Sequence, residues 1–509
     1  MRTSLVAILV LSLTACGGGH CYKDARAERA PQPMETWDQS SDSPRVDDPS
    51  PEPISNSEDY ADHGVSGFED PRQDALSTFS IDVDTASYAI ARRKINEGTL
   101  PPQAAVRVEE FVNYFRYDYG APDGDVPFAV NFEAAPSPFD PGTHFVRVGI
   151  QGQKIDENDR KPIHLVFLVD TSGSMQSPDK IGLLKSSLQV LVNNLRDGDT
   201  VALATYAGST SKVLGPTSVR ERERILAAID RLQAGGSTAM TSGLELAYQM
   251  AYENLDPNAT TRVVVCSDGD ANVGPNSHDT ILERIRHFTQ EGVTLSVIGF
   301  GMGNYKDHLM EQLADSGNGN YYYIDDFKQA VRVFEDDLMG TLVVIAKDVK
   351  IQVEFDSDEV DGYRLVGYEN RDIADEDFRK DHVDAGEIGA GHQVTALYEV
   401  EFRDGAQFEK ALTVRIRHKA PDGARATETS YQLAGQHLRS DFGEATADFK
   451  LALSASSFAE ILRGSPHAAM WTLSDVRQIL ESSGRKDEDA RELDGLIRRA
   501  SALRGYSRR

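Results

Sequence analysis

The sequence predicts an α/β protein whose centre is a doubly wound, mostly parallel sheet, flanked by an N-terminal α+β module and by a C-terminal β-rich module with a helical tail. Three observations carry this prediction. In residues 161–341, apolar runs of strand length alternate with amphipathic helical patterns, which is typical of a parallel sheet covered by helices on both faces. After residue 346 the pattern changes to alternating apolar and polar side chains, as in half-buried antiparallel strands. From residue 445 onward the pattern is helical.

Length and charge limit the organisation of the chain and its partners. A chain of 509 residues is too long for one ordinary core, so we expect two or three folded units with connecting segments. The net charge of −28 and the lack of a basic stripe argue against nucleic-acid binding, because phosphate contacts need clustered Lys and Arg side chains. The acidity favours solubility and attracts cations.

Residues 1–15 are predicted to be a signal peptide. Arg2 precedes a short apolar stretch, Leu5 to Leu13, which is too short to cross a bilayer as a stable helix. The tetrapeptide Leu-Thr-Ala-Cys that ends at Cys16 resembles the lipobox of bacterial lipoproteins. This resemblance implies cleavage before Cys16, a lipid on its thiol and a place in the bacterial cell envelope, and Gly17 favours the outer membrane in a host with two membranes. The alternative is an ordinary secretory signal with an incidental cysteine.

Residues 16–75 are predicted to be a disordered acidic tether. The segment is rich in Pro, Ser, Asp and Glu and has almost no apolar side chains to bury. Such a composition cannot form a core, and its like charges extend the chain. With a lipid at one end and a fold at the other, the segment would hold the fold away from a membrane surface.

Residues 76–160 are predicted to form the N-terminal α+β module. A strand begins near Leu76, a helix ends at Gly98, and a second helix covers Val106 to Phe115. Two segments with alternating apolar residues follow.

An oxygen-rich cluster lies between the first strand and the first helix of this module. It consists of Asp82, Asp84, Thr85 and Ser87. It resembles a second metal loop, but it lacks downstream partners, and short clusters of this kind usually cap helices or form turns. We therefore interpret it as a helix cap.

The central unit, residues 161–341, is predicted to contain the parallel sheet. Its strands are expected at Ile163–Asp170, Thr200–Tyr206, Arg262–Ser267, Val293–Phe300 and Asn320–Ile324. Its helices are expected at Lys180–Leu195, Val219–Leu232, Thr241–Asn254, Thr280–Glu291, Lys306–Ser316 and Lys328–Leu338. The segment Ser211–Thr217, after a short turn that contains Gly, is predicted to be an antiparallel edge strand.

Residues 342–509 are predicted to form a β-sandwich-like module with a helical tail. Segments with period-two alternation begin near Val349, Tyr363, Gln393 and Leu412, and helical patterns follow from Ala445. No segment of the mature chain is long and apolar enough to be expected to cross a membrane. The lipid is therefore the only membrane contact that we predict.

Oxygen-bearing side chains occur in three loops of the central unit. Asp170 ends the first apolar strand and is followed by Ser172 and Ser174; Thr238 lies in a Gly-rich loop before a helix; Asp268 ends another buried strand. In an open parallel sheet, ligands gather where the carboxyl ends of strands converge. Two carboxylates and three hydroxyls suit a hard divalent cation, with Mg²⁺ expected first and Mn²⁺ or Ca²⁺ as alternatives. One such loop alone would more often be a helix cap or a turn.

These residues, Asp170-x-Ser172-x-Ser174 with Thr238 and Asp268, resemble the metal-ion-dependent adhesion site of von Willebrand factor type A (VWA) domains. In that family the serines and the threonine contact the ion directly or through water, and the carboxylates bind it directly or support the other ligands. The stretches TFSIDVDTASY, LPPQAAVRVEEFVNYF, GNGNYYYID and VDAGEIGAGHQVTALYE resemble a bacterial family of three-part lipoproteins typified by YfbK.

For function, this resemblance implies little beyond metal-dependent binding. Together with the lipobox, it leads us to expect a non-enzymatic envelope lipoprotein that binds a protein ligand through a divalent ion. The carboxylates Asp170 and Asp268 leave net positive charge on such an ion, so a carboxylate of the protein ligand could fill its open position. The alternatives are a metal-dependent envelope hydrolase and a structural scaffold whose metal site is not essential. The sequence offers no general acid or base beside the ion, which disfavours the hydrolase.

Overall fold

The computed structural model describes residues 58–507, apart from residues 125, 157–158, 237–239, 270–274, 302–305, 384 and 422. The predicted signal peptide, Cys16 and most of the predicted tether lie outside the described residues. Within the described residues, no helix is long and apolar enough to cross a bilayer.

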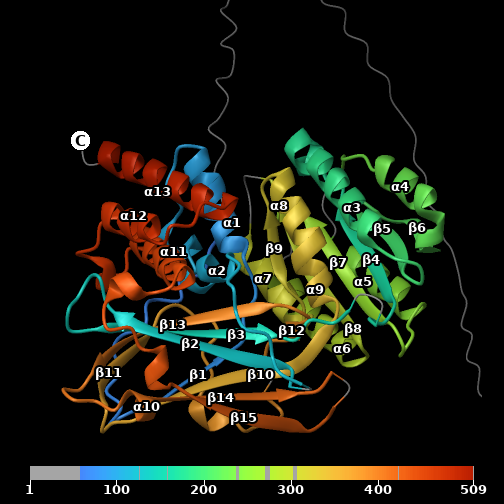
Figure 1. The fold of residues 1–509 in the computed structure, drawn as a ribbon. Coiled ribbons are helices and arrows are strands. Elements are labelled where there is room, and N and C mark those ends of the chain that lie inside the picture. The colour runs from blue at the N-terminus through green and yellow to red at the C-terminus, as the bar shows by residue number, and fades with distance from the viewer. Residues whose placement is uncertain are drawn as a thin grey trace, which may run out of the picture. The chain divides into compact units, whose positions relative to one another are not determined.

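The central unit contains a six-stranded sheet with the order β6-β5-β4-β7-β8-β9 (Figure 1). The strands are β4 (Ile163–Asp170), β5 (Thr200–Tyr206), β6 (Thr210–Ser218), β7 (Thr260–Ser267), β8 (Val293–Phe300) and β9 (Tyr321–Ile324). The edge strand β6 pairs antiparallel with β5, and the other neighbours pair in parallel. The predicted parallel α/β sheet and its antiparallel edge strand are therefore confirmed.

Helices cover both faces of this sheet because its strands are apolar on both sides. One face packs against α5 (Met240–Tyr252), α6 (Pro275–Gln290) and α7 (Asp307–Ser316). The other packs against α3 (Leu183–Asn194), α4 (Arg222–Asp230), α8 (Phe327–Val331) and α9 (Leu338–Thr341). Short π-helical segments precede α3 and join α8 to α9, where the sequence predicted uninterrupted helices.

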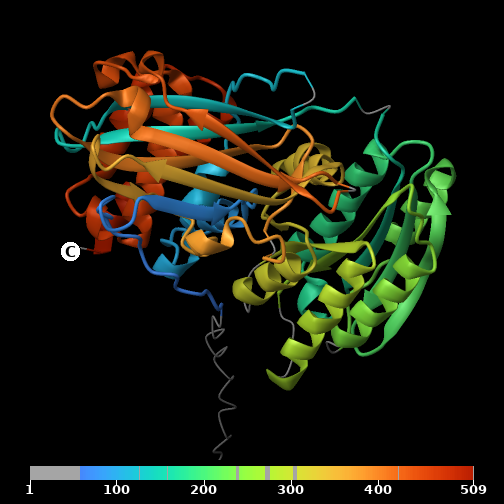
Figure 2. The same cartoon turned by 90° about the horizontal axis from the view of Figure 1, so that it is seen from below.

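Two further sheets combine strands from both sides of the central unit. One has the order β1-β10-β14-β15, with β12 also paired to β10, and the other has the order β11-β13-β3-β2. Their strands are β1 (Leu76–Ser80), β2 (Phe128–Pro136), β3 (His144–Gly152), β10 (Val344–Phe355), β11 (Val360–Leu365), β12 (Ile388–Gly389), β13 (Gln393–Phe402), β14 (Leu412–Lys419) and β15 (Ala426–Gln432). Side chains from both sheets share one apolar core, so the sheets stack as layers (Figure 2).

This pairing changes the predicted division of the chain. Residues 76–160 and 342–509 were expected to form separate modules, but β1 pairs with β10 and β3 pairs with β13. The β-sandwich expected for the C-terminal part therefore includes N-terminal strands. The central unit is inserted between two segments that fold together, and local sequence patterns do not reveal which distant strands will pair.

The helices outside the central unit also come from both ends of the described chain. Helices α1 (Ala86–Asn96) and α2 (Val108–Asn113) share a core with α11 (Ala447–Arg463), α12 (Leu473–Ser482) and α13 (Glu488–Ser507). Helix α11 begins where the Thr446 hydroxyl accepts a hydrogen bond from the Phe449 N–H (3.2 Å), and it ends at Gly464 with φ +75°. These are the polar N-cap and left-handed C-terminal residue that helix ends favour.

Buried arginines join these parts through ion pairs. The Arg364 side chain, which is fully buried, contacts Glu399 of β13 (2.9 Å) and Glu460 of α11 (3.1 Å). Arg92 of α1 donates through Nε to Asp325 after β9 (2.9 Å). Breaking such a buried pair leaves an uncompensated charge, which costs about 3–5 kcal/mol.

The cluster around Asp82 takes part in this pairing and does not cap a helix. Thr85, at the N-cap of α1, makes no side-chain cap hydrogen bond. Asp82 instead accepts from the Asp84 N–H in a local turn, and both carboxylates pair with Arg371. The capping interpretation is therefore wrong, because an arginine far along the chain provides the partner.

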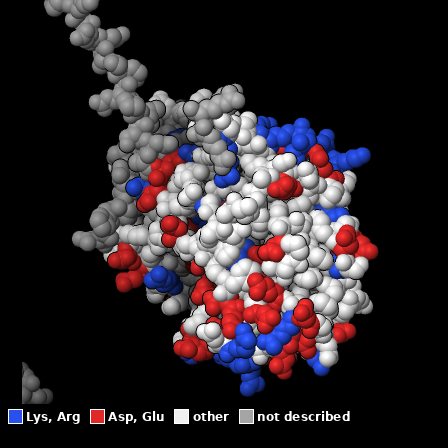
Figure 3. Space-filling view, turned by 90° about the vertical axis from the view of Figure 1, so that its left-hand side faces the viewer, with Lys and Arg blue, Asp and Glu red and all other residues white. Residues whose placement is uncertain are grey.

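Charged side chains are unevenly spread over the face of the molecule in Figure 3. On the face in Figure 3, Asp and Glu side chains gather in the lower half, Lys and Arg side chains gather at the upper right and at the lowest edge, and uncharged side chains fill the middle.

The buried carboxyl of Glu109 predicts a pH dependence of stability. Burial, and then the charges of Glu369 and Asp82, raise the pKa of Glu109 from 4.5 to about 7. Because the folded-state pKa is the higher one, stabilisation from the protonated form is fully present below pH 4.5 and is lost as pH rises toward 7. Glu109→Gln imitates the protonated form, so the variant should gain stability over the wild type between pH 5 and pH 8, by at most about 3 kcal/mol.

Melting temperatures of the wild type and of Glu109→Gln at pH 5 and pH 8 would measure this gain in stability. The Glu109 carboxylate accepts from the Tyr368 N–H (2.9 Å), and a glutamine oxygen keeps that bond. The control Glu253→Gln, at a side chain that is 51% exposed, should show no such change. If the melting temperatures of Glu109→Gln and the wild type changed equally with pH, this would contradict the raised pKa of Glu109.

Candidate metal centre

The carboxyl ends of β4 and β7 place two acidic side chains at the same edge of the sheet. The strands pair in parallel with Val169 opposite Cys266, so Asp170 ends β4 beside Ser267, and Asp268 follows one residue later. Asp170 is fully buried and Asp268 is 1% exposed. The Ser267 hydroxyl donates to Asp170 Oδ2 (3.2 Å) and accepts from the Gly269 N–H (3.1 Å).

The loop after β4 turns two hydroxyls toward each other. Asp170 Oδ1 accepts from the Ser172 N–H (2.8 Å), which fixes the turn. The Oγ atoms of Ser172 and Ser174 are 2.8 Å apart, and Ser172 is 2% exposed. The structure therefore brings Asp170, Ser172 and Ser174 together as the sequence predicted.

The loop predicted to carry Thr238 runs beside this turn. The Gly173 N–H donates to the carbonyl of Gly236 (3.0 Å), and the Gly235 N–H donates to the carbonyl of Thr171 (2.7 Å). Gly236 has φ +102°, a backbone conformation that favours glycine. Thr238 itself lies outside the described residues, as do Asp270 and Asn272 of the loop after Asp268.

Lys180 also belongs to this site, although it was not among the residues that the sequence predicted. Its Nζ contacts Asp268 Oδ2 at 2.9 Å, and its side chain is 12% exposed. A Cβ at Gly301 would collide with the Lys180 side chain, and Gly301 has φ +72°. The sequence placed Lys180 only at the start of a predicted helix, and no local pattern indicates that it reaches the end of β7.

Two buried carboxylates at one edge of the sheet favour a nearby cation, because their negative charges repel each other. Burial raises the pKa of Asp170, hydrogen bonds from Ser172 lower it, and the charge of Asp268 raises it again. Like charges in a buried setting repel strongly unless a positive charge lies nearby. In this structure the ammonium of Lys180 supplies such a charge to Asp268.

The donor set fits a hard divalent ion. Its described members, Asp170, Ser172, Ser174 and Asp268, offer only oxygen atoms, which Mg²⁺, Mn²⁺ and Ca²⁺ prefer. Among the described residues, no group of three or more His, Cys, Asp or Glu side chains is arranged to hold a metal. An ion here would thus depend on hydroxyls and water in addition to its two carboxylates.

Three sequence families match successive parts of the chain. Residues 54–147 match the family described as von Willebrand factor, residues 164–336 match the von Willebrand factor type A domain, and residues 340–503 match the family described as uncharacterized protein YfbK, C-terminal. The second match covers β4 to α8 and includes Asp170, Ser172, Ser174 and Asp268.

Relatives extend this similarity over most of the chain. The chain is 41% identical over 375 residues to the uncharacterized protein YfbK of Escherichia coli (strain K12). The aligned region covers 72% of this chain and 64% of that protein. The chain is also 23% identical over 277 residues to inter-alpha-trypsin inhibitor heavy chain H3 of Bos taurus. This second aligned region covers 50% of this chain and 30% of that protein. The matched part is thus less than two thirds of the length of either relative.

A solved structure titled von Willebrand factor type A from Catenulispora acidiphila is also similar. The superposition has a TM-score of 0.44 at 18% sequence identity and covers 75% of this chain and 98% of that chain.

The contact between Lys180 and Asp268 predicts competition between the ammonium and a divalent ion. Lys180→Met removes the positive charge and keeps an unbranched apolar side chain, so it should tighten Mn²⁺ binding about tenfold, or about 1.4 kcal/mol. Calorimetric titration of wild type and variant with MnCl₂ would measure the change. The control Lys185→Met, at a lysine whose Nζ contacts the carbonyl of Asp230, should leave the affinity unchanged. An unchanged or weaker affinity in Lys180→Met would contradict competition.

Proposed function

The chain is a YfbK-like protein with a VWA domain, and from this premise we propose that it is a cell-envelope lipoprotein that binds a protein ligand through a divalent metal ion. The proposed ligands to the ion are Asp170, Ser172, Ser174, Thr238 and Asp268. Mg²⁺ is the proposed ion, with Mn²⁺ and Ca²⁺ as the alternatives.

One observation supports this proposal above the others. Within the part of the chain that matches a VWA domain, parallel strands β4 and β7 bring Asp170 and Asp268 to one edge, beside the paired hydroxyls of Ser172 and Ser174. An oxygen set with only two carboxylates leaves positive charge on a divalent ion. A carboxylate of a partner protein would then be attracted to that ion at the rim of the sheet.

The residues of the chain prepare this edge for an ion. Ser267 and the Ser172 N–H hold the Asp170 carboxylate in place. Asp268 gives up its contact with Lys180 when an ion takes over the neutralisation of its charge. A divalent ion supplies a binding position for an external carboxylate, and the buried strands beneath keep that position rigid.

A VWA domain suggests a role in protein interaction or adhesion, and VWA domains are in general non-enzymatic. We therefore propose that this chain is not an enzyme. The described carboxylates and hydroxyls at the site can bind a cation, and the Lys180 ammonium neutralises Asp268 in its place. The alternative functions, a metal-dependent envelope hydrolase and a scaffold with a non-essential metal site, make different predictions about metal removal.

Loss of either carboxylate should weaken metal binding. We expect Asp170→Asn and Asp268→Asn each to lower the affinity for Mn²⁺ by about 10- to 100-fold, because each removes a negative charge and keeps the side-chain shape. Asp179→Asn, at an exposed aspartate near the same loop, is the matched control and should bind as the wild type does. Calorimetry measures all four proteins, and equal affinities throughout would contradict the site.

Partner capture should depend on the same ion. Crosslinked pull-down from an envelope extract is expected to recover a protein that is lost both with EDTA and with Asp268→Asn, and retained with Asp179→Asn. Capture that survives both changes would favour the scaffold. Turnover of an envelope substrate that disappears with Asp268→Asn would favour the hydrolase.

The proposed anchor makes a separate prediction about Cys16. Cys16→Ser should abolish incorporation of a labelled fatty acid and release the protein from the membrane fraction, because one thiol carries the lipid. Cys21→Ser, five residues later, is the control and should stay labelled and membrane-bound. Release of the wild type without label would support the secretory signal instead.

A further inference from the structure

A polar cavity lies at the end of the central sheet opposite to the candidate metal centre. Its volume is about 220 Å³. Arg262 lies near the amino end of β7, and Asn318 to Asn320 precede β9, whereas Asp170 and Asp268 lie at the carboxyl ends of their strands. The segment before β12 closes the cavity with Glu387. Three parts of the fold therefore meet here: the central unit, β1, and the segment between β11 and β12.

Arg262 brings a buried positive charge to this cavity. It is 1% exposed, and its guanidinium donates to the hydroxyls of Thr294 (2.9 Å), Ser296 (3.2 Å) and Thr341 (3.3 Å) and to the Thr341 carbonyl (3.4 Å). All of these acceptors are neutral. In the described part of the chain, no ion pair joins Arg262 to a carboxylate. Arg364, by comparison, is fully buried and has two carboxylate partners.

Glu387 brings an incompletely bonded negative charge. Its Oε2 is buried and has no hydrogen-bond partner among the described residues. Burial raises the pKa of Glu387, while the charges of Lys347 and Arg262 and a hydrogen bond with the Asn318 side chain lower it. Burial likewise lowers the pKa of Arg262. Each charge is thus held at a desolvation cost that its neighbours only partly offset.

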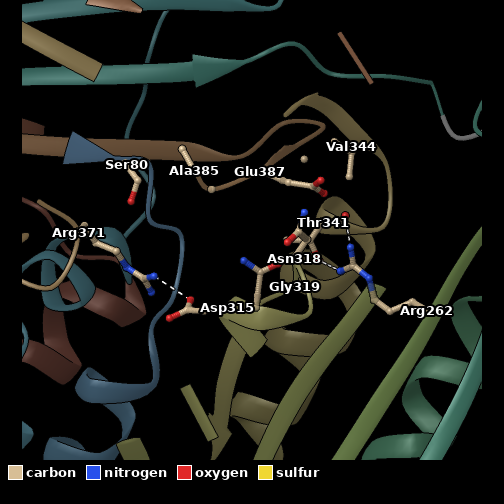
Figure 4. A pocket seen from close by; sticks show the side chains of 13 residues that line it. Ser80, Arg262, Asp315, Asn318, Gly319, Thr341, Val344, Arg371, Ala385 and Glu387 are labelled. Atoms are coloured by element: carbon tan, nitrogen blue, oxygen red, sulfur yellow. Dashed lines mark hydrogen bonds and ion pairs between the residues drawn. The ribbon is translucent and has the colours of Figure 1, made fainter. Parts of the chain in front are cut away.

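The two charges lie in one space without contacting each other. Figure 4 shows the ion pair of Arg371 and Asp315 (2.8 Å) on one side of the cavity and Arg262 on the other, with Asn318, Thr341 and Glu387 between them. Arg371 also pairs with Asp82 and Asp84. Among the described residues, by contrast, Arg262 and Glu387 form no ion pair with each other or with another side chain.

The cavity walls are held by close backbone contacts. Asn318 has φ +47°, which places a non-glycine residue in the left-handed region. A Cβ at Gly319 would collide with the Leu295 carbonyl, and a Cβ at Gly386 would collide with the Ile81 carbonyl. These contacts fix the loops and keep the Asn318 amide and the Glu387 carboxylate facing the same space.

We propose that this cavity binds a small zwitterion that carries one carboxylate and one ammonium group, such as an amino acid. The ligand carboxylate pairs with Arg262, and the ligand ammonium pairs with the Glu387 carboxylate beside the Asn318 amide. An anion or a cation alone compensates only one of the two protein charges. One water needs roughly 10–15 Å³ of such space, so the cavity has room for a ligand of several non-hydrogen atoms.

Calorimetric titration with matched probes tests this inference. The zwitterions are glycine, β-alanine and 4-aminobutyrate, which differ in the separation of their charges, and acetate and methylammonium carry one charge each. At least one zwitterion should bind about tenfold more tightly than either single-charge probe. Because the cavity is remote from Asp170 and Asp268, EDTA should leave this affinity unchanged, which separates the result from the proposed metal function.

Two variants assign the binding to the cavity. Arg262→Met and Glu387→Gln should each weaken the best zwitterion about tenfold or more. The matched controls Arg224→Met and Glu221→Gln, at side chains that are 61% and 53% exposed, should not change it. If Arg262→Met lowers the melting temperature too far for titration, the affinity of Glu387→Gln for the best zwitterion tests on its own whether the ligand binds in the cavity. Binding of no zwitterion, or acetate binding as tightly as the best zwitterion, overturns the proposal.

Discussion

The parallel pairing of β4 with β7 is the constraint on which the rest of the site depends. It brings two carboxylates, Asp170 and Asp268, to one buried edge, where each would repel the other in the absence of a cation. Hydrogen bonds from Ser172 and Ser267 hold Asp170 in place at the end of β4. Lys180 provides a tethered positive charge at the same edge. The two carboxylates therefore need a positive charge nearby. Lys180 provides it to Asp268 in this structure, and the proposed ion would provide it in place of Lys180.

A second level of organisation keeps this central unit in place. The strands before it pair with strands after it, so the chain leaves and re-enters the same β-sandwich. The Gly152 N–H at the end of β3 donates to the carbonyl of His392 (2.8 Å), and the Ala390 N–H donates to the carbonyl of Val343 just before β10 (2.8 Å). Both connections of the central unit are thus bonded to the segment around β12. Neither flanking segment has a complete core of its own, because the apolar core of the sandwich takes side chains from both.

Local sequence patterns explain how much of this could be predicted. The apolar runs of the central sheet identified its strands, and Asp170 and Asp268 at the ends of two runs identified the candidate site. Strand β15 (Ala426–Gln432) was missed because it is polar and its residues are half-buried or exposed, and it depends on pairing with β14. The contacts of Asp84 with Arg371 and of Asp268 with Lys180 join residues far apart in sequence. Such contacts depend on the tertiary fold, which single-segment patterns do not contain. The same holds for the meeting of Arg262 with Glu387 in one cavity.

The central claim is that a divalent ion binds between the ends of β4 and β7 in the VWA domain. A crystal structure of the protein with Mn²⁺, located by its anomalous scattering, tests this claim most directly. The account predicts an anomalous peak with oxygen ligands from Ser172, Ser174 and one or both of Asp170 and Asp268, at about 2.0–2.6 Å for direct ligands, with the Lys180 ammonium moved away from Asp268. Crystals that bind Mn²⁺ elsewhere and keep the Lys180–Asp268 contact would contradict it.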